Sequence, residues 1–189
     1  KLTMSMLRVF TAVTIPDSVK RIILSSIPKL PSEHGISFVD SQHLHLALNF
    51  IGNVKDTEIP ELCSAFASAL NDFSPFEIEM RGFGAFPDIH RPRVLWVGVE
   101  QGKEELVALN KKFRDIIEDF GFLQEKRYTP HLTIGRAQKT NPQPEIIQAI
   151  QTRVEKVVCE TIQVKNVTVY NSLPEKSGPS SIPLATLKL

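Results

Sequence analysis

One short segment with a histidine occurs twice in this chain, and it limits the folds that the chain can adopt. The first copy is HLHLALNF at residues 43–50, and the second is YTPHLTIGR at residues 128–136. Both alternate polar with apolar residues, which is typical of a β-strand with one buried face. We therefore expect each strand to present its histidine, His45 or His131, on the exposed face.

The same alternation assigns neighbours to each histidine, because side chains two positions apart on a strand share a face. Ala47 and Asn49 fall on the face of His45, whereas Phe50 falls with the leucines on the core face. In the second copy Thr133 falls beside His131 and brings a hydroxyl to that face.

The sequence before each histidine strand is also repeated. Residues 8–13 (RVFTAV) resemble residues 93–98 (RVLWVG), and they begin 37 positions before His45 and 38 positions before His131. A helical pattern fills the gap both times. An internal repeat indicates the architecture, and two copies favour two similar lobes over a solenoid, which needs at least three. We expect the two lobes to bring the histidines face to face across a groove.

The pattern of elements favours an α+β fold with mostly antiparallel strands, because consecutive strands occur without helices between them. The segment with Gly and Pro at 82–92 is predicted to be a loop, and the strand after residue 44 is predicted to end at Gly52-Asn53. A long amphipathic helix is expected at 103–120, ended by Gly121. We expect residues 7–189 to form a single domain of two similar lobes.

Composition excludes some classes of function. The chain of 189 residues has a net charge of +1, which argues against a broad basic surface that wraps nucleic acid but leaves room for a small pocket. No apolar run approaches the roughly 18 residues of a membrane span, and no secretory signal is visible. We expect a cytoplasmic protein that does not bind a membrane, and residues 1–3 are expected to be an expression remnant.

The two histidine segments and their surroundings resemble the 2H phosphoesterases, and among these the LigT-like RNA 2′,3′-cyclic phosphodiesterases, also known as 2′-5′ RNA ligase-like proteins. The resemblance extends from about residue 7 to 189. A single His-x-Thr-x motif is weak evidence, but two in matching contexts, 86 positions apart, are fairly specific. The segments that carry it are Arg8-Val9-Phe10-Thr11-Ala12, Leu44 to Gly52, Arg93-Val94-Leu95-Trp96 and Pro130 to Arg136.

The resemblance implies a bilobal, pseudo-twofold fold in which two antiparallel sheets line a central groove, with helices outside. It implies that the substrate is an RNA end or nucleotide with a 2′,3′-cyclic phosphate, opened by water to a 2′-phosphate without a metal or other cofactor. Some members also join RNA ends reversibly through 2′-5′ linkages. The family roles make His45 the proton donor and His131 the proton acceptor. We expect a monomer without an obligatory protein partner.

The residues fit this chemistry independently. In-line opening of a cyclic phosphodiester needs a base on one side of phosphorus and an acid on the other, and histidine serves as either near neutral pH. Thr133 and Arg136 could donate to the charged phosphate oxygens. Phe10 and Tyr128 are candidates to stack on a base, as is Trp96, for which core packing is the stronger expectation.

Ala47 departs from the family motif, which has Thr or Ser there. Alanine cannot donate a hydrogen bond, so the reaction is expected to be slower unless another donor, such as Asn49, replaces the hydroxyl. This favours an alternative interpretation, a binding module for RNA ends or nucleotides with weakened catalysis. A metal site made of His43, His45 and His131 is a further alternative, although no carboxylate or cysteine ligands stand at a recognised spacing.

Overall fold

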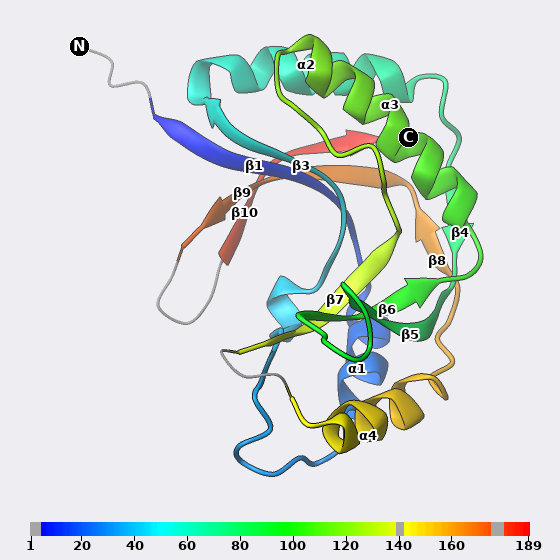
Figure 1. The fold of residues 1–189 in the computed structure, drawn as a ribbon. Coiled ribbons are helices and arrows are strands. Elements are labelled where there is room, and N and C mark those ends of the chain that lie inside the picture. The colour runs from blue at the N-terminus through cyan, green and yellow to red at the C-terminus, as the bar shows by residue number, and fades with distance from the viewer. Residues whose placement is uncertain (1–4, 139–141, 175–179) are drawn as a thin grey trace.

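The structure is a computed structural model, and it describes residues 5–138, 142–174 and 180–189 (Figure 1). The expected remnant at residues 1–3 lies outside these ranges. The helices are α1 (Asp17–Ser26), η1 (Ser41–His43), η2 (Asp56–Glu58), α2 (Ile59–Leu70), α3 (Lys103–Asp119) and α4 (Pro144–Val154). The strands are β1 (Met6–Thr14), β2 (Ile36–Phe38), β3 (His45–Lys55), β4 (Phe76–Ile78), β5 (Met80–Phe86), β6 (Val94–Val99), β7 (His131–Ala137), β8 (Ile162–Val164), β9 (Asn166–Leu173) and β10 (Ser180–Lys188).

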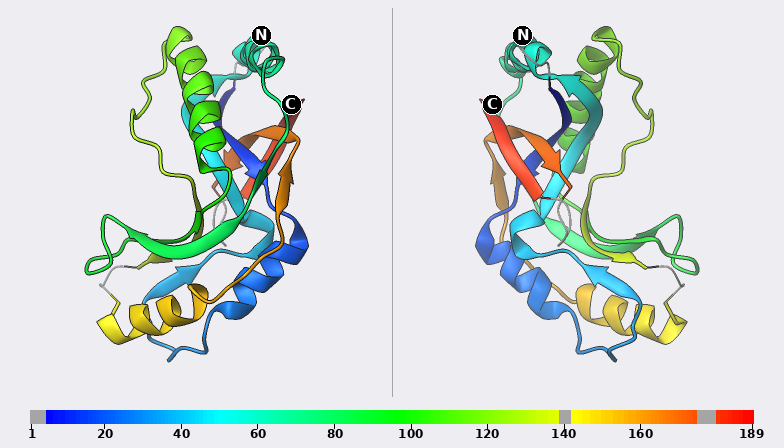
Figure 2. Two further views of the ribbon diagram at one scale, coloured as in Figure 1. Left: turned by 90° about the vertical axis from the view of Figure 1, so that its right-hand side faces the viewer. Right: turned by 90° about the vertical axis from the view of Figure 1, so that its left-hand side faces the viewer.

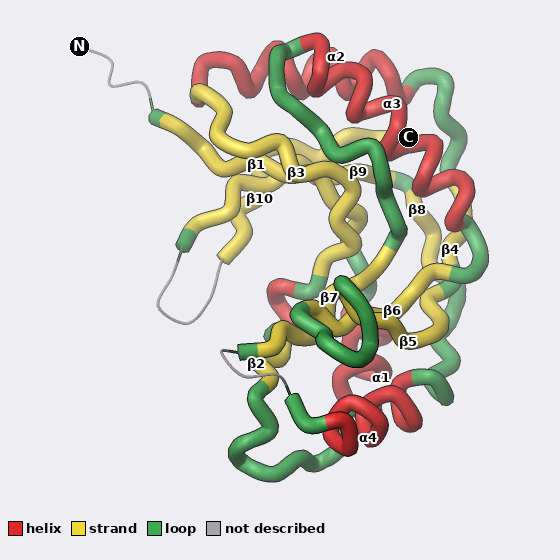
Figure 3. Tube along the Cα trace, in the orientation of Figure 1, coloured by secondary structure: helices red, strands yellow, loops and turns green. Residues whose placement is uncertain are grey.

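The strands of the described residues form two larger antiparallel sheets and a small third one. Sheet A has the order β10-β9-β1-β3, sheet B the order β2-β7-β6-β5, and β4 pairs with β8. Helices α2 and α3 lie on the outer side of sheet A, and α1 and α4 lie at the opposite end of the molecule, beyond sheet B (Figures 2 and 3). The prediction of an α+β fold with antiparallel sheets is confirmed.

Each histidine strand pairs with the strand that opens its repeat. In sheet A, His45 lies opposite Thr14 of β1, and in sheet B, His131 lies opposite Gly98 of β6. The sheets nevertheless mix both halves of the chain, because β2 pairs with β7 while β9 joins β1. One hydrophobic core runs through both sheets as a result.

The helix α3 shows why the amphipathic pattern produces this packing. Leu106, Leu109, Phe113 and Ile117 form its apolar stripe, and all four are fully buried. Phe113 stacks on Phe66 of α2, with 4.3 Å between the ring centroids. Removing such a buried phenylalanine costs about 3–5 kcal/mol, so this pair fixes α2 and α3 over sheet A.

Two predicted boundaries are wrong. The glycines of the predicted loop at 82–92 instead allow strand β5, because the Trp96 ring lies over Gly84, where a Cβ atom would come within 2.2 Å of it. Strand β3 continues past Gly52, which has a positive φ of 103° beside an irregularity in the pairing with β1, and ends at Lys55. Among the described residues, no helix is long and apolar enough to cross a membrane.

Candidate active site

His45 is the first residue of β3, and its ring is oriented by the backbone. Its Nδ1 lies 3.1 Å from the carbonyl oxygen of His43. Because a carbonyl only accepts, Nδ1 carries the hydrogen and Nε2 remains for proton transfer. The rings of Tyr170 and Phe10 flank the imidazole at centroid distances of 4.6 and 6.2 Å.

His131 is the first residue of β7, and its contacts are of the same kinds as those of His45. Its Nδ1 donates to the carbonyl oxygen of Thr129 at 2.7 Å, so Nε2 is again the nitrogen left for chemistry. Phe86 meets the ring edge-on at 4.9 Å, and Trp96 lies at 6.0 Å. In both copies, therefore, a carbonyl two residues earlier fixes the tautomer and two aromatic rings hold the imidazole.

Strands β3 and β7 lie against each other, although they belong to different sheets. Each strand begins with its histidine, so the fold brings the two copies of the motif into one region. The expectation that the two imidazoles face each other at the span of one phosphate stays a prediction.

Both histidines have pKa values below the ordinary 6.5. The pKa of His45 is lowered to about 4, mainly by burial and then by the nearby charge of Lys20, while the hydrogen bond to His43 opposes the shift. Burial also lowers the pKa of His131, helped by the charge of Arg136 and opposed by the hydrogen bond to Thr129. At neutral pH both imidazoles are therefore uncharged in the free protein.

Lys20 is a residue of this site that sequence reasoning missed. It lies in α1, where its side chain is nine-tenths buried and reaches an ion pair with the exposed Asp17 at 3.7 Å. Helix α1 packs against η1, which leads into His45, and this contact brings the charge close to the imidazole. The sequence offers no local signal for it, because α1 and β3 meet only through the fold.

The two histidine strands also share a bulge that changes which side chains reach the histidine face. Burial follows the same order in both, with the sixth residue exposed: Phe50 in β3 and Arg136 in β7. The register shifts beside Thr11 in β1 and beside Trp96 in β6 cause this break of alternation. Phe50 is thus not in the core, as strict alternation predicts, but 69% exposed.

In β7 the bulge gathers the polar groups expected to bind phosphate. Thr133 is half-buried two residues after His131, and Arg136 is exposed and near enough for its charge to act on that imidazole. In β3 the equivalent positions are Ala47 and Phe50, which are both apolar. The groups predicted to bind phosphate therefore lie on one copy of the motif only.

A row of aromatic rings extends from His45 along sheet A. Tyr170 stacks on Phe10 with centroids 5.2 Å apart, and Phe10 stacks on Phe50 at 5.8 Å. Phe10 and Tyr170 are buried while Phe50 is open to solvent. The sequence predicts Phe10 as a candidate for base stacking. The fold places the rings of Tyr170 and Phe50 in the same row as Phe10.

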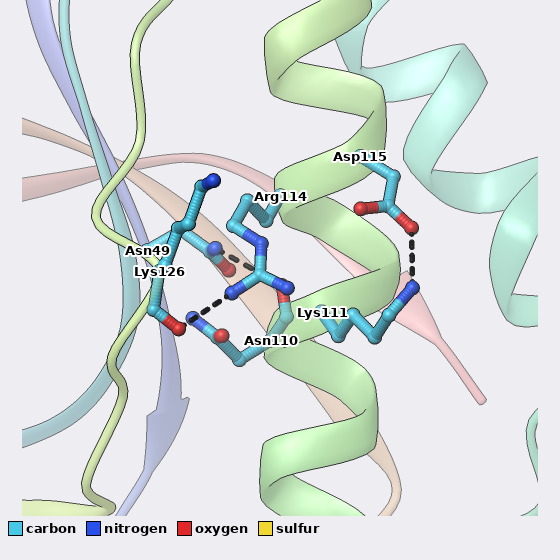
Figure 4. A network of polar contacts seen from close by, with 6 residues as sticks. All are labelled: Asn49, Asn110, Lys111, Arg114, Asp115 and Lys126. Atoms are coloured by element: carbon cyan, nitrogen blue, oxygen red, sulfur yellow. Dashed lines mark hydrogen bonds and ion pairs between the residues drawn. The ribbon is translucent and has the colours of Figure 1, made fainter.

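Asn49 and Tyr128 have structural partners. Asn49 is buried and donates from Nδ2 to the carbonyl oxygen of Asn110, while its Oδ1 accepts from Thr11 (Figure 4 shows the contact with α3). Asn49 therefore cannot replace the missing hydroxyl at Ala47. Tyr128 donates its hydroxyl to the carbonyl oxygen of Ala47 at 2.8 Å, and burial raises its pKa.

No group of three or more His, Cys, Asp or Glu in the described part of the chain is placed to hold a metal ion. His43, His45 and His131 thus do not form the metal site weighed as an alternative. His43 instead contributes its carbonyl to His45, and its own Nδ1 is buried without a partner among those residues.

Comparisons with known proteins show what the chain is similar to. A family model described as the 2′-5′ RNA ligase superfamily matches residues 18–172. A protein of Archaeoglobus fulgidus named RNA 2′,3′-cyclic phosphodiesterase is 31% identical over 173 residues, which are 92% of this chain and 95% of the relative. A relative of the same name from Aeropyrum pernix is 32% identical over 75% of this chain and 79% of its own length.

Solved structures share the fold. The crystal structure of TT0787 from Thermus thermophilus superposes with a TM-score of 0.81 at 24% identity, over 97% of this chain and 98% of the other. The crystal structure of E. coli LigT complexed with 3′-AMP gives a TM-score of 0.77 at 24% identity, over 98% and 99% of the two chains.

Proposed function

The chain belongs to the 2′-5′ RNA ligase superfamily, and from this premise we propose that it is an enzyme that hydrolyses 2′,3′-cyclic phosphates of RNA ends or nucleotides to 2′-phosphates. The observation that carries the proposal is the pair of matched histidines, His45 and His131, each with Nδ1 held by a carbonyl and with no hydrogen bond to Nε2 from the described residues. Two imidazoles prepared in the same way suit a reaction that needs one acid and one base. The names of the relatives supply the substrate class.

In the proposed reaction, a water oxygen attacks phosphorus while the bond from phosphorus to the ribose 3′ oxygen breaks. His131 Nε2 takes a proton from the water, and His45 Nε2 gives a proton to the departing 3′ oxygen. The product carries a 2′-phosphate and a 3′-hydroxyl, and solvent restores the two protonation states. With a 5′-hydroxyl in place of water, the same steps would form a 2′-5′ linkage.

Because the histidine pKa values are lowered, the substrate itself is expected to influence the protonation of His45. His45 must be charged to act as an acid, yet with a pKa of about 4 it is neutral in the free protein at pH 7. A bound cyclic phosphodiester carries a negative charge, which favours a charged imidazole beside it. The substrate thus helps to charge its own acid. Thr133 and Arg136 would then stabilise the charge that gathers on the free phosphate oxygens.

The alternative is a binding module for RNA ends or nucleotides with weakened catalysis. The observation that favours it is Ala47, which brings no hydroxyl to the His45 face, where the family motif has Thr or Ser. The same mechanism would operate at a lower rate, so the two hypotheses differ in turnover and not in where the ligand binds.

The test is incubation of the protein with a 2′,3′-cyclic nucleotide in excess chelator, followed by phosphorus NMR of the products. We expect the 2′-monophosphate as the only product, and its formation should be lost in both His45→Ala and His131→Ala. Tight binding without turnover would support the binding module. Turnover that stops in chelator and returns with added zinc would contradict the two-histidine scheme.

A further inference from the structure

A groove of about 380 Å³ lies between α3 and the segment that leads into β7. Lys111 and Arg114 line it from α3, and Lys126 and Arg127 line it from the segment. None of the residues that line it, all of which the structure describes, is Asp or Glu. Four cations around one groove are a strong local charge in a chain whose net charge is only +1.

Most of this charge has no acidic partner. Lys111 forms an ion pair with Asp115 at 2.9 Å, on the α3 surface (Figure 4). The other three cations have no carboxylate within 4.0 Å in the described ranges. Arg114 donates one guanidinium N–H to the carbonyl oxygen of Lys126 at 2.9 Å, which orients the group across the groove and leaves its other donors for a ligand.

The groove adjoins the histidine face through a shared wall. Tyr128 and Thr129 line it, while the Tyr128 hydroxyl binds the Ala47 carbonyl and the Thr129 carbonyl holds His131. Farther along the same segment, Gln124 donates to the carbonyl oxygen of Phe50 at 2.9 Å, beside the aromatic row. An RNA strand that runs from the histidines over Phe50 would therefore meet this segment and then the four cations.

We propose that this basic groove binds phosphodiester groups of the RNA strand on the 5′ side of the cyclic end. The proposal rests on the proposed function, because that function supplies the RNA. Guanidinium and ammonium groups are suited to phosphate oxygens, and the volume is in the range of ligand sites. The protein would then favour oligonucleotides over mononucleotides, with affinity supplied by backbone charge and not by base sequence.

The experiment compares a cyclic mononucleotide with a ten-nucleotide RNA that ends in the same cyclic nucleotide, at several salt concentrations. The double variant K126Q/R127Q should lower kcat/KM on the RNA about tenfold at low salt and leave the mononucleotide rate unchanged. Each lost phosphate contact lowers the salt dependence of single-strand binding by about 0.7 in the log–log slope, so two contacts should lower it by about 1.4.

The control is R153Q/K156Q, which removes an equal charge from two exposed residues at the end of α4 and should behave as the wild type. An equal loss of kcat/KM on the RNA in both double variants would overturn the groove proposal, because only the net charge of the protein would then matter. If K126Q/R127Q lowered kcat/KM on the mononucleotide as much as on the RNA, the groove proposal would also be overturned. If the wild type opens the mononucleotide but shows no preference for the RNA, the groove proposal fails and the proposed function stands. If the wild type opens neither substrate, the proposed function fails, and anisotropy of the labelled RNA with the same variants tests the groove separately.

Discussion

Replacement of Ala47 by threonine should raise turnover of a cyclic phosphate. Ala47 stands two residues after His45, in the position that Thr133 occupies relative to His131. The strand neighbour of Ala47 across the sheet is Ala12, whose side chain is a single methyl group. Threonine suits a strand because its β-branched side chain packs well there.

The size of the gain follows from the hydrogen bond that the hydroxyl restores. A hydrogen bond to a charged group contributes about 1.5–3 kcal/mol, and each 1.36 kcal/mol in the barrier is a factor of ten in rate. We therefore expect Ala47→Thr to raise kcat about ten- to a hundred-fold. KM should change little if the hydroxyl meets an oxygen whose charge grows only in the transition state.

Ala47→Val is the matched control, because valine has the shape of threonine without the hydroxyl. Steady-state hydrolysis of a 2′,3′-cyclic nucleotide by both variants separates the effect of shape from that of the donor. An equal rise in kcat in both variants would show that the larger side chain, and not the hydroxyl, causes the effect. No rise for the threonine variant, with its unfolding midpoint unchanged, would refute the idea that a donor is missing from this face.

Three further predictions concern neighbouring residues. Thr133→Val should lower kcat about ten- to a hundred-fold by the same reasoning, and an unchanged rate would remove Thr133 from the site. Tyr128→Phe leaves the Ala47 carbonyl without its partner, so urea denaturation should show a loss of about 1 kcal/mol in unfolding free energy; unchanged stability would mean that water replaces the hydroxyl. His45 takes up its proton only near pH 4 when folded but near pH 6.5 when unfolded, so unfolding free energy should fall as pH drops from about 6.5 to 4. This fall should be smaller in His45→Ala, and equal curves would contradict the lowered pKa.

Much of the fold could be predicted because its signals are local. The apolar stripe of α3 and the helix-ending glycine at 121, which has a φ of 90°, are properties of short stretches of sequence. The alternation from Leu44 to Leu48 places three leucines inward, and all three are buried.

The period-two pattern of a single strand could not indicate where the alternation breaks. The bulge in β3 depends on the register with β1 and on the buried hydrogen bonds that join Asn49 to Thr11 and Asn110. These partners are far apart in the sequence, so period-two reasoning places Phe50 in the core and Asn49 on the histidine face. A usable signal was present in the repeat itself, since aligning HLALNF with HLTIGR puts Phe50 opposite the exposed Arg136.

Under the proposed function, that alignment also accounts for how a symmetric pair of strands would serve an asymmetric substrate. Both copies keep the histidine and its carbonyl partner, and the proposed reaction needs proton transfer on both sides of phosphorus. Beyond the histidine they differ: Thr133 and Arg136 suit the charged phosphate, whereas Ala47 and Phe50 present an apolar surface beside Phe10. A cyclic nucleotide has the same asymmetry, with a phosphate at one end and an aromatic base at the other. Restoring the hydroxyl at position 47 should therefore act on the chemical step, while Phe50 should matter only for substrates that carry a base.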